Sequence, residues 1–203
     1  MIAGEVALPD ISGIDVVDAK QLMRSALRTR RSKLTAKEVE DFKDGFTDSI
    51  LEFAGDAKTV SLYVSVNNEP VTLRALDILR DRGVRVLLPK LGPGLARMWA
   101  EFGKGGLAIE APGRPPSPIS DALPSETIEE ADAIIVPALA LNHRGIRLGQ
   151  GGGWYDRILK LNVTDKVGAL IYPWELVSVP LPHDEQDVSI PWALLPGEIV
   201  ETS

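Results

Sequence analysis

A short segment from Gly149 to Gly153 contains four glycines and is flanked by Arg147 and Arg157. Glycine lets backbone N–H groups approach an anion without a Cβ atom in the way, and arginine adds charge-assisted hydrogen bonds. The segment follows an apolar stretch and precedes a predicted short helix over residues 154–161, whose N-terminus would attract negative charge. Phosphate is the natural ligand of such a loop. A plain glycine-rich turn is the alternative, because neither GxxxxGK[ST] nor GxGxxG is matched.

A second group of residues with binding potential lies near the N-terminus. Lys20, Arg24 and Arg28 are four residues apart, and Arg31 falls on the same helical face because eleven residues make almost three turns. The segment 20–37 holds seven basic residues and no acidic one. Since like charges on one face repel, something anionic should offset them. A phosphate ligand is one possibility, and the charge pattern alone favours the acidic helix predicted next in the chain.

The helices that carry these charges are predicted from their capping signals. Asp18 and Gln21 form a capping box before a helix of about four turns. Thr35 and Glu38 form a second one, and apolar residues then recur at three- and four-residue steps until Gly55. The second helix should therefore pack on the core through an apolar stripe.

The rest of the chain alternates between strand and helix patterns. TVSLYVSV, TLRALDILRDRG and VRVLLP read as strand, helix and strand, which is the parallel crossover unit of an α/β sheet. DAIIVPALAL is the most apolar strand and should lie in the centre of the sheet. The remaining predicted elements are two short strands (RMWAEF, LAIEAP), a surface loop (GRPPSPIS), a strand (VGALIY) and an acidic loop (PHDEQD).

Composition excludes several classes of function. The chain has no cysteine and two histidines, which excludes disulfides, thiol catalysis and an ordinary Cys/His zinc site, so any metal should be held by oxygen. The net charge of −7 argues against a nucleic-acid partner, which requires a basic surface. His143 and His183 lie in polar loops without partners for base catalysis, and we expect them to face solvent.

Length and hydropathy favour a single soluble domain. The 203 residues, 44% of them hydrophobic, suffice for one globular core. The N-terminus has neither the basic start nor the apolar run of a signal peptide, and no segment approaches membrane-spanning length. We therefore expect a cytoplasmic protein without a membrane partner.

Four segments of the sequence together carry a family resemblance. They are K-x-x-x-R starting at Lys20, NNEP after the first strand, VPALAL, and RLGQGGGWYDR. From about residue 18 to 195 the chain resembles the 5-formyltetrahydrofolate cyclo-ligases, also called methenyltetrahydrofolate synthetases. The resemblance implies a single-domain, Rossmann-like three-layer α/β fold with a mostly parallel central sheet flanked by helices. We also expect a monomer, with the domain over 18–203 preceded by an extension over 1–17.

The activity implied by the resemblance uses ATP as co-substrate and Mg²⁺ as cofactor. ATP would phosphorylate the formyl oxygen of 5-formyltetrahydrofolate, and N10 would then close the ring to 5,10-methenyltetrahydrofolate, with release of ADP and phosphate. Positioning of the reactants and balancing of phosphate charge would be the main tasks of the protein. The small-molecule substrates are its only implied partners.

The resemblance also assigns roles by position. Arg147 and Lys20 are the implied catalytic pair, and Asp156 and Asp187 the implied magnesium ligands, with Asp184 or Glu185 as alternatives on sequence grounds. Folate contacts are implied for Glu69, Val64 and Trp154, although core packing is an alternative role for Val64. ATP contacts are implied for Lys20, Gln21, Leu22, Met23 and Arg24 in the helix and for Arg147, Leu148, Gly149, Gln150, Gly151, Gly152, Gly153, Trp154 and Tyr155 in the loop.

This sequence departs from the family pattern at two places. Trp154 stands where the family usually has tyrosine, so the ring could still stack on folate while the phenolic hydroxyl is lost. Leu141 and Asn142 replace the usual Phe-Asp pair before the loop. Two rival interpretations follow: a nucleotide- or folate-binding module without turnover, and a related ATP-dependent cyclo-ligase that acts on another formylated amine.

Overall fold

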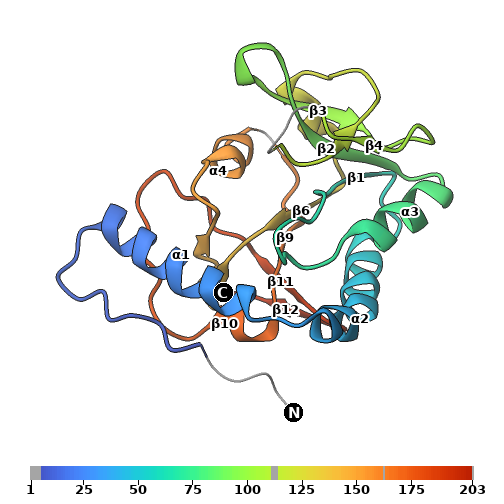
Figure 1. The fold of residues 1–203 in the computed structure, drawn as a ribbon. Coiled ribbons are helices and arrows are strands. Elements are labelled where there is room, and N and C mark those ends of the chain that lie inside the picture. Colours follow the sequence, from blue (N-terminus) through green and yellow to red (C-terminus); the bar gives the residue numbers. More distant parts are fainter. Residues whose placement is uncertain (1–5, 111–113, 162, 203) are drawn as a thin grey trace.

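The computed structural model describes residues 6–110, 114–161 and 163–202, which form a mixed α/β fold around one mostly parallel sheet (Figure 1). The helices are α1 (Val16–Ser32), α2 (Ala36–Ala54), α3 (Leu73–Asp81) and α4 (Trp154–Ile158), with 3-10 turns at Pro93–Leu95, Ser125–Glu130 and Pro173–Glu175. The strands are β1 (Thr59–Ser61), β2 (Arg85–Leu91), β3 (Arg97–Glu101), β4 (Leu107–Ala108), β5 (Ser117–Pro118), β6 (Ala133–Pro137), β7 (Ala140–Asn142), β8 (Arg147–Leu148), β9 (Val167–Leu170), β10 (Leu176–Val177), β11 (Trp192–Leu195) and β12 (Glu198–Glu201).

The main sheet has seven strands in the order β12-β11-β9-β6-β1-β2-β3. Neighbours from β11 to β2 are parallel, and the edge strands β12 and β3 are antiparallel to theirs. The predicted crossover through α3 and the central place of β6 are both confirmed. Three strands, β10-β7-β8, make a separate small sheet, and β4 pairs with β5.

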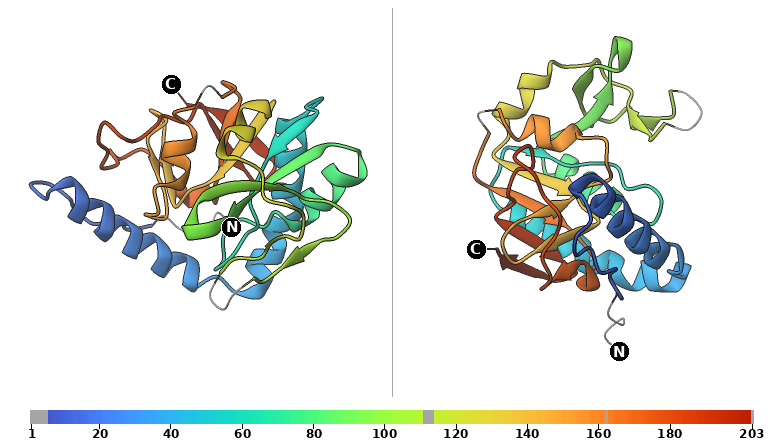
Figure 2. Two further views of the ribbon diagram at one scale, coloured as in Figure 1. Left: turned by 90° about the horizontal axis from the view of Figure 1, so that it is seen from above. Right: turned by 90° about the vertical axis from the view of Figure 1, so that its left-hand side faces the viewer.

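Helices cover both faces of the main sheet because its strands are apolar on both sides. In β6, Ala133 and Ile135 pack with residues of α2 and α3, whereas Ile134 and Val136 pack with residues of α4. Successive side chains of a strand point to opposite faces, so a strand that is apolar throughout must be covered twice. The predicted three-layer α/β architecture is thereby confirmed (Figure 2).

The first helix packs on the small sheet rather than on the main one. Met23 and Leu27 of α1 lie in a buried cluster with Leu139, Ala140 and Leu148. This contact turns the apolar stripe of α1 inward and leaves its basic face toward the segment that follows β8. In Figure 2, α1 accordingly runs along one side of the molecule, and its C-terminal end leads into α2.

Several predicted boundaries differ from the observed ones. The side chain of Asp15 caps α1 by accepting hydrogen bonds from the N–H groups of Val17 and Asp18, so the prediction of Asp18 as the cap was wrong. Asp18 instead lies in the first turn, where a carboxylate is favourable near the positive end of the helix. The capping box of Thr35 and the helix end at Gly55 are confirmed.

Three predicted strands are shorter or divided. VPALAL splits at Pro137, which has no N–H with which to continue the ladder, and its last residues enter the small sheet as β7. TVSLYVSV is a paired strand over Thr59–Ser61 only. LAIEAP is a strand at Leu107–Ala108, GRPPSPIS contains β5, and residues 111–113 of these segments lie outside the described residues.

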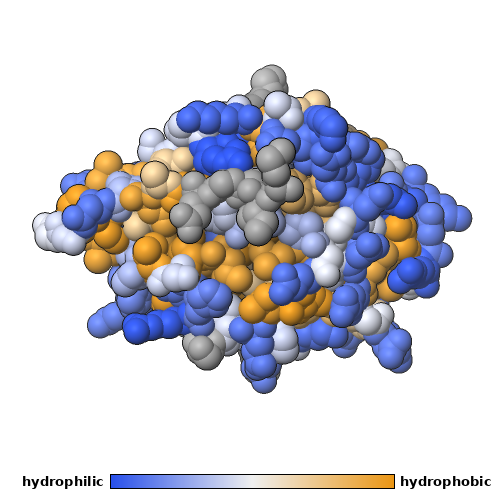
Figure 3. Space-filling model, turned by 90° about the horizontal axis from the view of Figure 1, so that it is seen from below, coloured by the Kyte–Doolittle hydropathy of each residue, from blue (hydrophilic) through white to orange (hydrophobic). Residues whose placement is uncertain are grey.

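The N-terminal segment lies against the domain where it is described. Leu8 and Ile11 pack on the cluster beneath α1, while Ile14 and Val17 are exposed apolar residues at the start of that helix. On the underside of the molecule, apolar areas alternate with hydrophilic ones (Figure 3). The proposed boundary at residue 17 stays a prediction. None of the helices in the described part of the chain has the length and apolar character needed to span a bilayer.

Candidate active site

Two adjoining cavities open where the parallel strands β1, β2 and β6 end. Chain connections leave β1 and β6 in opposite directions across the sheet, and such a switch point is where open α/β sheets bind ligands. The cavities have volumes of about 900 Å³ and about 510 Å³. Both are lined by Pro137, Gln150, Trp154 and Tyr155, which therefore form a shared wall.

The glycine loop lines the smaller cavity, together with Arg147. The Arg147 guanidinium is buried and donates hydrogen bonds from Nη1 to the Pro137 carbonyl (3.0 Å) and from Nη2 to the Asp156 carboxylate (2.8 Å). These contacts fix a cation at the cavity wall. The predicted helix after the loop is only the five-residue α4, so its dipole adds less than a long helix would.

Glycine is required at position 149 because of the neighbouring arginine. A Cβ atom there would lie 2.7 Å from Nη1 of Arg147, whereas a Cβ atom on Gly152 would meet nothing within 4 Å. On the ATP-binding role that the resemblance implies for this loop, we expect Gly149→Ala to displace the guanidinium and lower kcat/KM for ATP by about 10- to 100-fold. Gly152→Ala is the matched control in the same loop and should change it little. Equal losses in steady-state kinetics of the two variants would contradict this role of Gly149.

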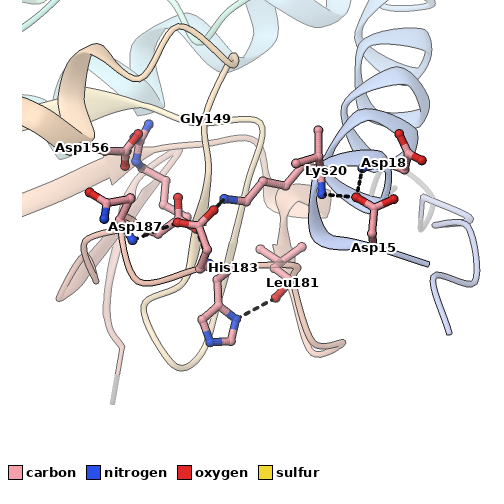
Figure 4. A network of polar contacts seen from close by, with 12 residues as sticks. Asp15, Asp18, Lys20, Gly149, Asp156, Leu181, His183 and Asp187 are labelled. Carbon is pink, nitrogen blue, oxygen red and sulfur yellow. Dashed lines mark hydrogen bonds and ion pairs between the residues drawn. The ribbon is translucent and has the colours of Figure 1, made fainter. Parts of the chain in front are cut away.

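The basic face of α1 contacts this loop and the acidic loop near the C-terminus. Lys20 Nζ lies 2.7 Å from the carboxylate of Asp184 and 2.6 Å from that of Asp187 (Figure 4). Arg24 Nε donates to the Gly149 carbonyl at 2.9 Å, and Arg28 Nη2 donates to the Gln150 carbonyl at 2.7 Å. The charge pattern had favoured neutralisation by α2, but no ion pair joins α1 to α2 among residues whose placement is described.

The charges of this face respond to burial and to one another. Burial lowers the pKa of Lys20, but the carboxylates of Asp184 and Asp187 outweigh it, so the pKa lies above its ordinary value. Burial and the nearby Arg28 lower the pKa of Arg24. An arginine remains protonated in any case. Lys20 and Arg24 therefore present two cations to the smaller cavity, which both of them line.

The larger cavity contains the predicted folate contacts. Val64, Glu69 and Trp154 all line it. Glu69 is held by a tight turn in which Asn67 and Asn68 have φ values of 49° and 59°, a left-handed conformation that asparagine tolerates better than most residues. Its carboxylate accepts a hydrogen bond from the Val66 N–H at 3.1 Å. The turn in the NNEP segment thus places the Glu69 carboxylate in the cavity wall.

Gln150 connects the two cavities. Its side-chain Nε2 donates to Glu69 at 3.0 Å, while its side-chain oxygen accepts from Arg28 at 3.2 Å. Burial raises the pKa of Glu69, and the hydrogen bonds from Val66 and Gln150 together with the charge of Arg31 oppose that shift. The glycine loop and the glutamate of the other cavity are therefore in direct contact.

Trp154 and Tyr155 form the aromatic part of the shared wall. The Trp154 ring packs edge-on against Trp99 with centroids 6.2 Å apart, and Arg97 lies 5.9 Å from its centroid. Among the described residues, neither Trp154 Nε1 nor the Tyr155 hydroxyl has a hydrogen-bond partner, although both atoms are buried. Burial raises the pKa of Tyr155, so its hydroxyl stays protonated and available as a donor.

The structure brings most of the predicted ATP contacts together, but not all of them. Leu148 lines the smaller cavity with the rest of the loop. Gln21, Leu22 and Met23 do not line it. The first two are exposed, and Met23 is on the buried face of α1. Asp156 and Asp187 both line the cavity. Three or more acidic or histidine side chains do not converge as a ready-made metal site anywhere in the described ranges.

Sequence reasoning missed residues that reach the site from distant elements. Arg97 of β3 donates to the Gly152 carbonyl at 3.1 Å, and Arg31 of α1 forms a buried ion pair with Glu175. The proline-containing segment 114–117 forms part of the wall of the larger cavity. No sequence signal links these positions, because their partners are 55 to 144 residues away.

The other polar residues noted in the sequence have ordinary structural places. Asn142 accepts hydrogen bonds from the N–H groups of Arg144 and Ile146, both at 3.0 Å, and so shapes the turn between β7 and β8. His143 and His183 are exposed, as predicted, and the ring of His183 contacts the Leu181 carbonyl (Figure 4). The departure at Asn142 therefore leaves the turn before the glycine loop well supported.

Solved structures of known proteins share the fold of this chain. The solved structure of 5,10-methenyltetrahydrofolate synthetase from Aquifex aeolicus has a TM-score of 0.70 at 23% identity and covers 90% of this chain and 92% of its own. The corresponding protein from Mycoplasma pneumoniae has a TM-score of 0.67 at 18% identity, over 88% and 99% of the two chains. At these identities the two likenesses show a shared fold.

Relatives found by sequence identify the family of this chain. The 5-formyltetrahydrofolate cyclo-ligase of Mycolicibacterium smegmatis is 35% identical over 88% of this chain and 94% of its own length. That of Escherichia coli is 28% identical over 86% and 99%. The sequence model of the 5-formyltetrahydrofolate cyclo-ligase family matches residues 16–196. The chain therefore belongs to the 5-formyltetrahydrofolate cyclo-ligase family.

Proposed function

We propose that this protein converts 5-formyltetrahydrofolate to 5,10-methenyltetrahydrofolate with ATP as co-substrate, Mg²⁺ as cofactor, and release of ADP and phosphate. The observation that carries the proposal is the pair of cavities with a shared wall. One cavity presents cations and glycine backbone, and the other presents the buried Glu69 carboxylate in a lining that includes both apolar and charged side chains. A phosphate donor and a pterin would thus meet at Gln150, Trp154 and Tyr155.

The reaction needs this arrangement because a formyl group on nitrogen is amide-like. The formyl oxygen attacks the terminal phosphorus of ATP, the bond to ADP breaks, and the oxygen becomes part of a phosphate leaving group. N10 then attacks the formyl carbon and loses its proton to water, the carbon–oxygen bond breaks, and phosphate departs with that oxygen as the methenyl bridge forms. Alignment of the two substrates across the shared wall is the main contribution to rate.

Residues of the smaller cavity would stabilise charge on the transferred phosphoryl group. Arg147 is already oriented by Pro137 and Asp156, so little ordering is needed when a phosphate arrives. Lys20 and Arg24 now contact carboxylates and a carbonyl. We propose that phosphate oxygens take over these cations when ATP binds. Trp154 would stack on the folate from the other side of the wall.

The carboxylates of the smaller cavity fit a magnesium ion. Mg²⁺ is usually bound by one or two carboxylates, with water and phosphate oxygens completing six ligands, so a complete protein cage is not needed. Asp156 and Asp187 would hold it, and each is now paired with a cation, Arg147 or Lys20. Once bound, the ion would neutralise phosphate charge during transfer.

Asp156→Asn is expected to raise the Mg²⁺ concentration needed for half-maximal turnover by about tenfold, because one charged ligand becomes neutral. The fold should persist, since the side chain is partly exposed at the start of α4. Magnesium titrations of turnover would measure the shift, with Asp165→Asn, outside the smaller cavity, as the control. An unaltered titration would move the metal role to Asp184 or Glu185.

The proposed function is tested by mixing protein, ATP, Mg²⁺ and 5-formyltetrahydrofolate and following the ultraviolet absorbance of the methenyl product. Product formation that depends on both substrates is the expected result. ATP binding without product would favour the binding module, and turnover of another formylated amine alone would favour the related cyclo-ligase. A monomeric state and a cytoplasmic location stay predictions, which gel filtration and cell fractionation can check.

A further inference from the structure

Arg31 is a buried arginine in the wall of the larger cavity, and its ion pair uses only part of its guanidinium. Nε and Nη2 each donate to the Glu175 carboxylate at 2.7 Å, and Nη2 also donates to the Ala138 carbonyl at 2.6 Å. The side chain of Arg31 is 2% exposed and that of Glu175 is fully buried. Two edges of the planar guanidinium are therefore fixed by the protein.

The third nitrogen of this guanidinium has no partner. Among the described residues, Nη1 of Arg31 is buried and donates to no protein atom. A buried donor left unsatisfied costs about 1–3 kcal/mol, more for a charged group. Since Arg31 lines the larger cavity, an acceptor on a ligand in that cavity could satisfy Nη1.

Stability alone does not explain the pair. Burying two charges is expensive, and apolar residues of similar volume often do as well or better. Here the arrangement also leaves both N–H groups of Nη1 unused, and the ion pair with Glu175 does not account for them. A binding role explains both the rigid orientation of the guanidinium and its unused donor.

Glu69 supplies the complementary group in the same cavity. Its carboxylate already accepts an N–H from the planar amide of Gln150 at 3.0 Å, which shows that an amide-like donor can reach it. Arg31 and Glu69 are close enough that the arginine lowers the pKa of the glutamate against the effect of burial. The cavity thus offers an acceptor and a donor near each other.

We propose that Arg31 is a specificity-determining residue that donates from Nη1 to the C4 carbonyl oxygen of the pterin, while Glu69 accepts from N3–H and the 2-amino group. This inference rests on the proposed function. A 2-amino-4-oxo pterin presents two donors and one acceptor along one edge, which matches the carboxylate and the guanidinium. A 2,4-diamino ring places a donor where the acceptor should be, so Arg31 discriminates against it.

The matched variants are Glu175→Gln, which keeps Arg31, and the double variant Arg31→Met with Glu175→Gln, which removes both charges together. Calorimetry would give dissociation constants for 5-formyltetrahydrofolate and for its 2,4-diamino counterpart. The preference for the 4-oxo compound should be at least about tenfold lower in the double variant than in Glu175→Gln. Arg31→Lys is a second route, because lysine keeps the charge beside Glu175 but has no second terminal nitrogen.

Thermal unfolding shows whether the double variant is folded, and this determines which pair of proteins is compared. If the double variant folds, an unchanged preference relative to Glu175→Gln would overturn the role of Arg31. If it does not fold, the preference of Arg31→Lys is compared with that of the unmodified protein, and an unchanged preference would again overturn the role of Arg31. Failure of the proposed function looks different, since the unmodified protein would then give no methenyl product. Normal turnover with an unchanged preference would overturn the assignment of Arg31 alone.

Discussion

Arg147→Ala is expected to lower kcat/KM for ATP by about 10³-fold, which is the largest effect of any single change in the site. The guanidinium is buried in the wall of the smaller cavity and is oriented by Pro137 and Asp156 before any ligand arrives. A cation that needs no reorganisation contributes most when charge moves during phosphoryl transfer. Steady-state kinetics at saturating folate would measure the loss.

Two controls separate this role from damage to the fold. Arg144→Ala removes an exposed arginine that lines neither of the two adjoining cavities, and its kcat/KM should stay close to that of the unmodified protein. Calorimetry should show that Arg147→Ala keeps its affinity for 5-formyltetrahydrofolate within about threefold, because the proposed folate site is the other cavity. Equal loss of ATP use and folate affinity would contradict the assignment of Arg147 to phosphate.

Glu69→Gln should weaken binding of 5-formyltetrahydrofolate by about 100-fold while the KM for ATP stays nearly constant. In the proposed site, a carboxylate that accepts from the pterin N3–H and the 2-amino group is replaced by an amide with one acceptor, and hydrogen bonds to charged groups are worth about 1.5–3 kcal/mol each. Glu69 as a residue is only 8% exposed, so water does not replace the lost contacts. Calorimetric titration with folate would measure the change.

Glu110→Gln is the matched control for Glu69, because Glu110 lines the same cavity but is paired with Lys90 at 3.0 Å. It should bind folate within about threefold of the unmodified protein. The pH dependence gives an independent check: burial raises the pKa of Glu69, so folate affinity should fall on acidification at a higher pH than for an ordinary glutamate. Similar pH profiles for Glu69→Gln and the unmodified protein would contradict a binding role for the ionised carboxylate.

Local signals in the sequence predicted much of the fold. The capping box at Thr35 and the helix end at Gly55 depend on residues within one turn, and the structure places both as predicted. The apolar run that became β6 predicted a central strand because only a strand covered on both faces is apolar throughout. Asp15 and Asp18 are both residues of a type that caps helices. The sequence alone gave no basis for choosing Asp15, which is the observed cap of α1.

Site residues that belong to a sequence motif could be predicted, whereas residues that tertiary packing brings to the site could not. Arg147 and Glu69 were assigned by resemblance, and the structure places them on adjoining cavities. The pair of Arg31 with Glu175 and the contact of Arg97 with the glycine loop depend on how α1 and β3 pack against distant segments. The charge pattern favoured neutralisation of the basic face of α1 by the acidic helix α2. The pattern could not show that the apolar stripe of α1 faces the small sheet, which directs the basic face elsewhere.

The central claim is that ATP in one cavity phosphorylates the formyl oxygen of the folate in the other. The most direct test uses 5-formyltetrahydrofolate carrying a heavy isotope of oxygen in the formyl group, with ATP, Mg²⁺ and the unmodified protein. Mass spectrometry of the released phosphate should find the label in one oxygen atom for each methenyl group formed. Methenyl product accompanied by unlabelled phosphate would contradict transfer across the shared wall.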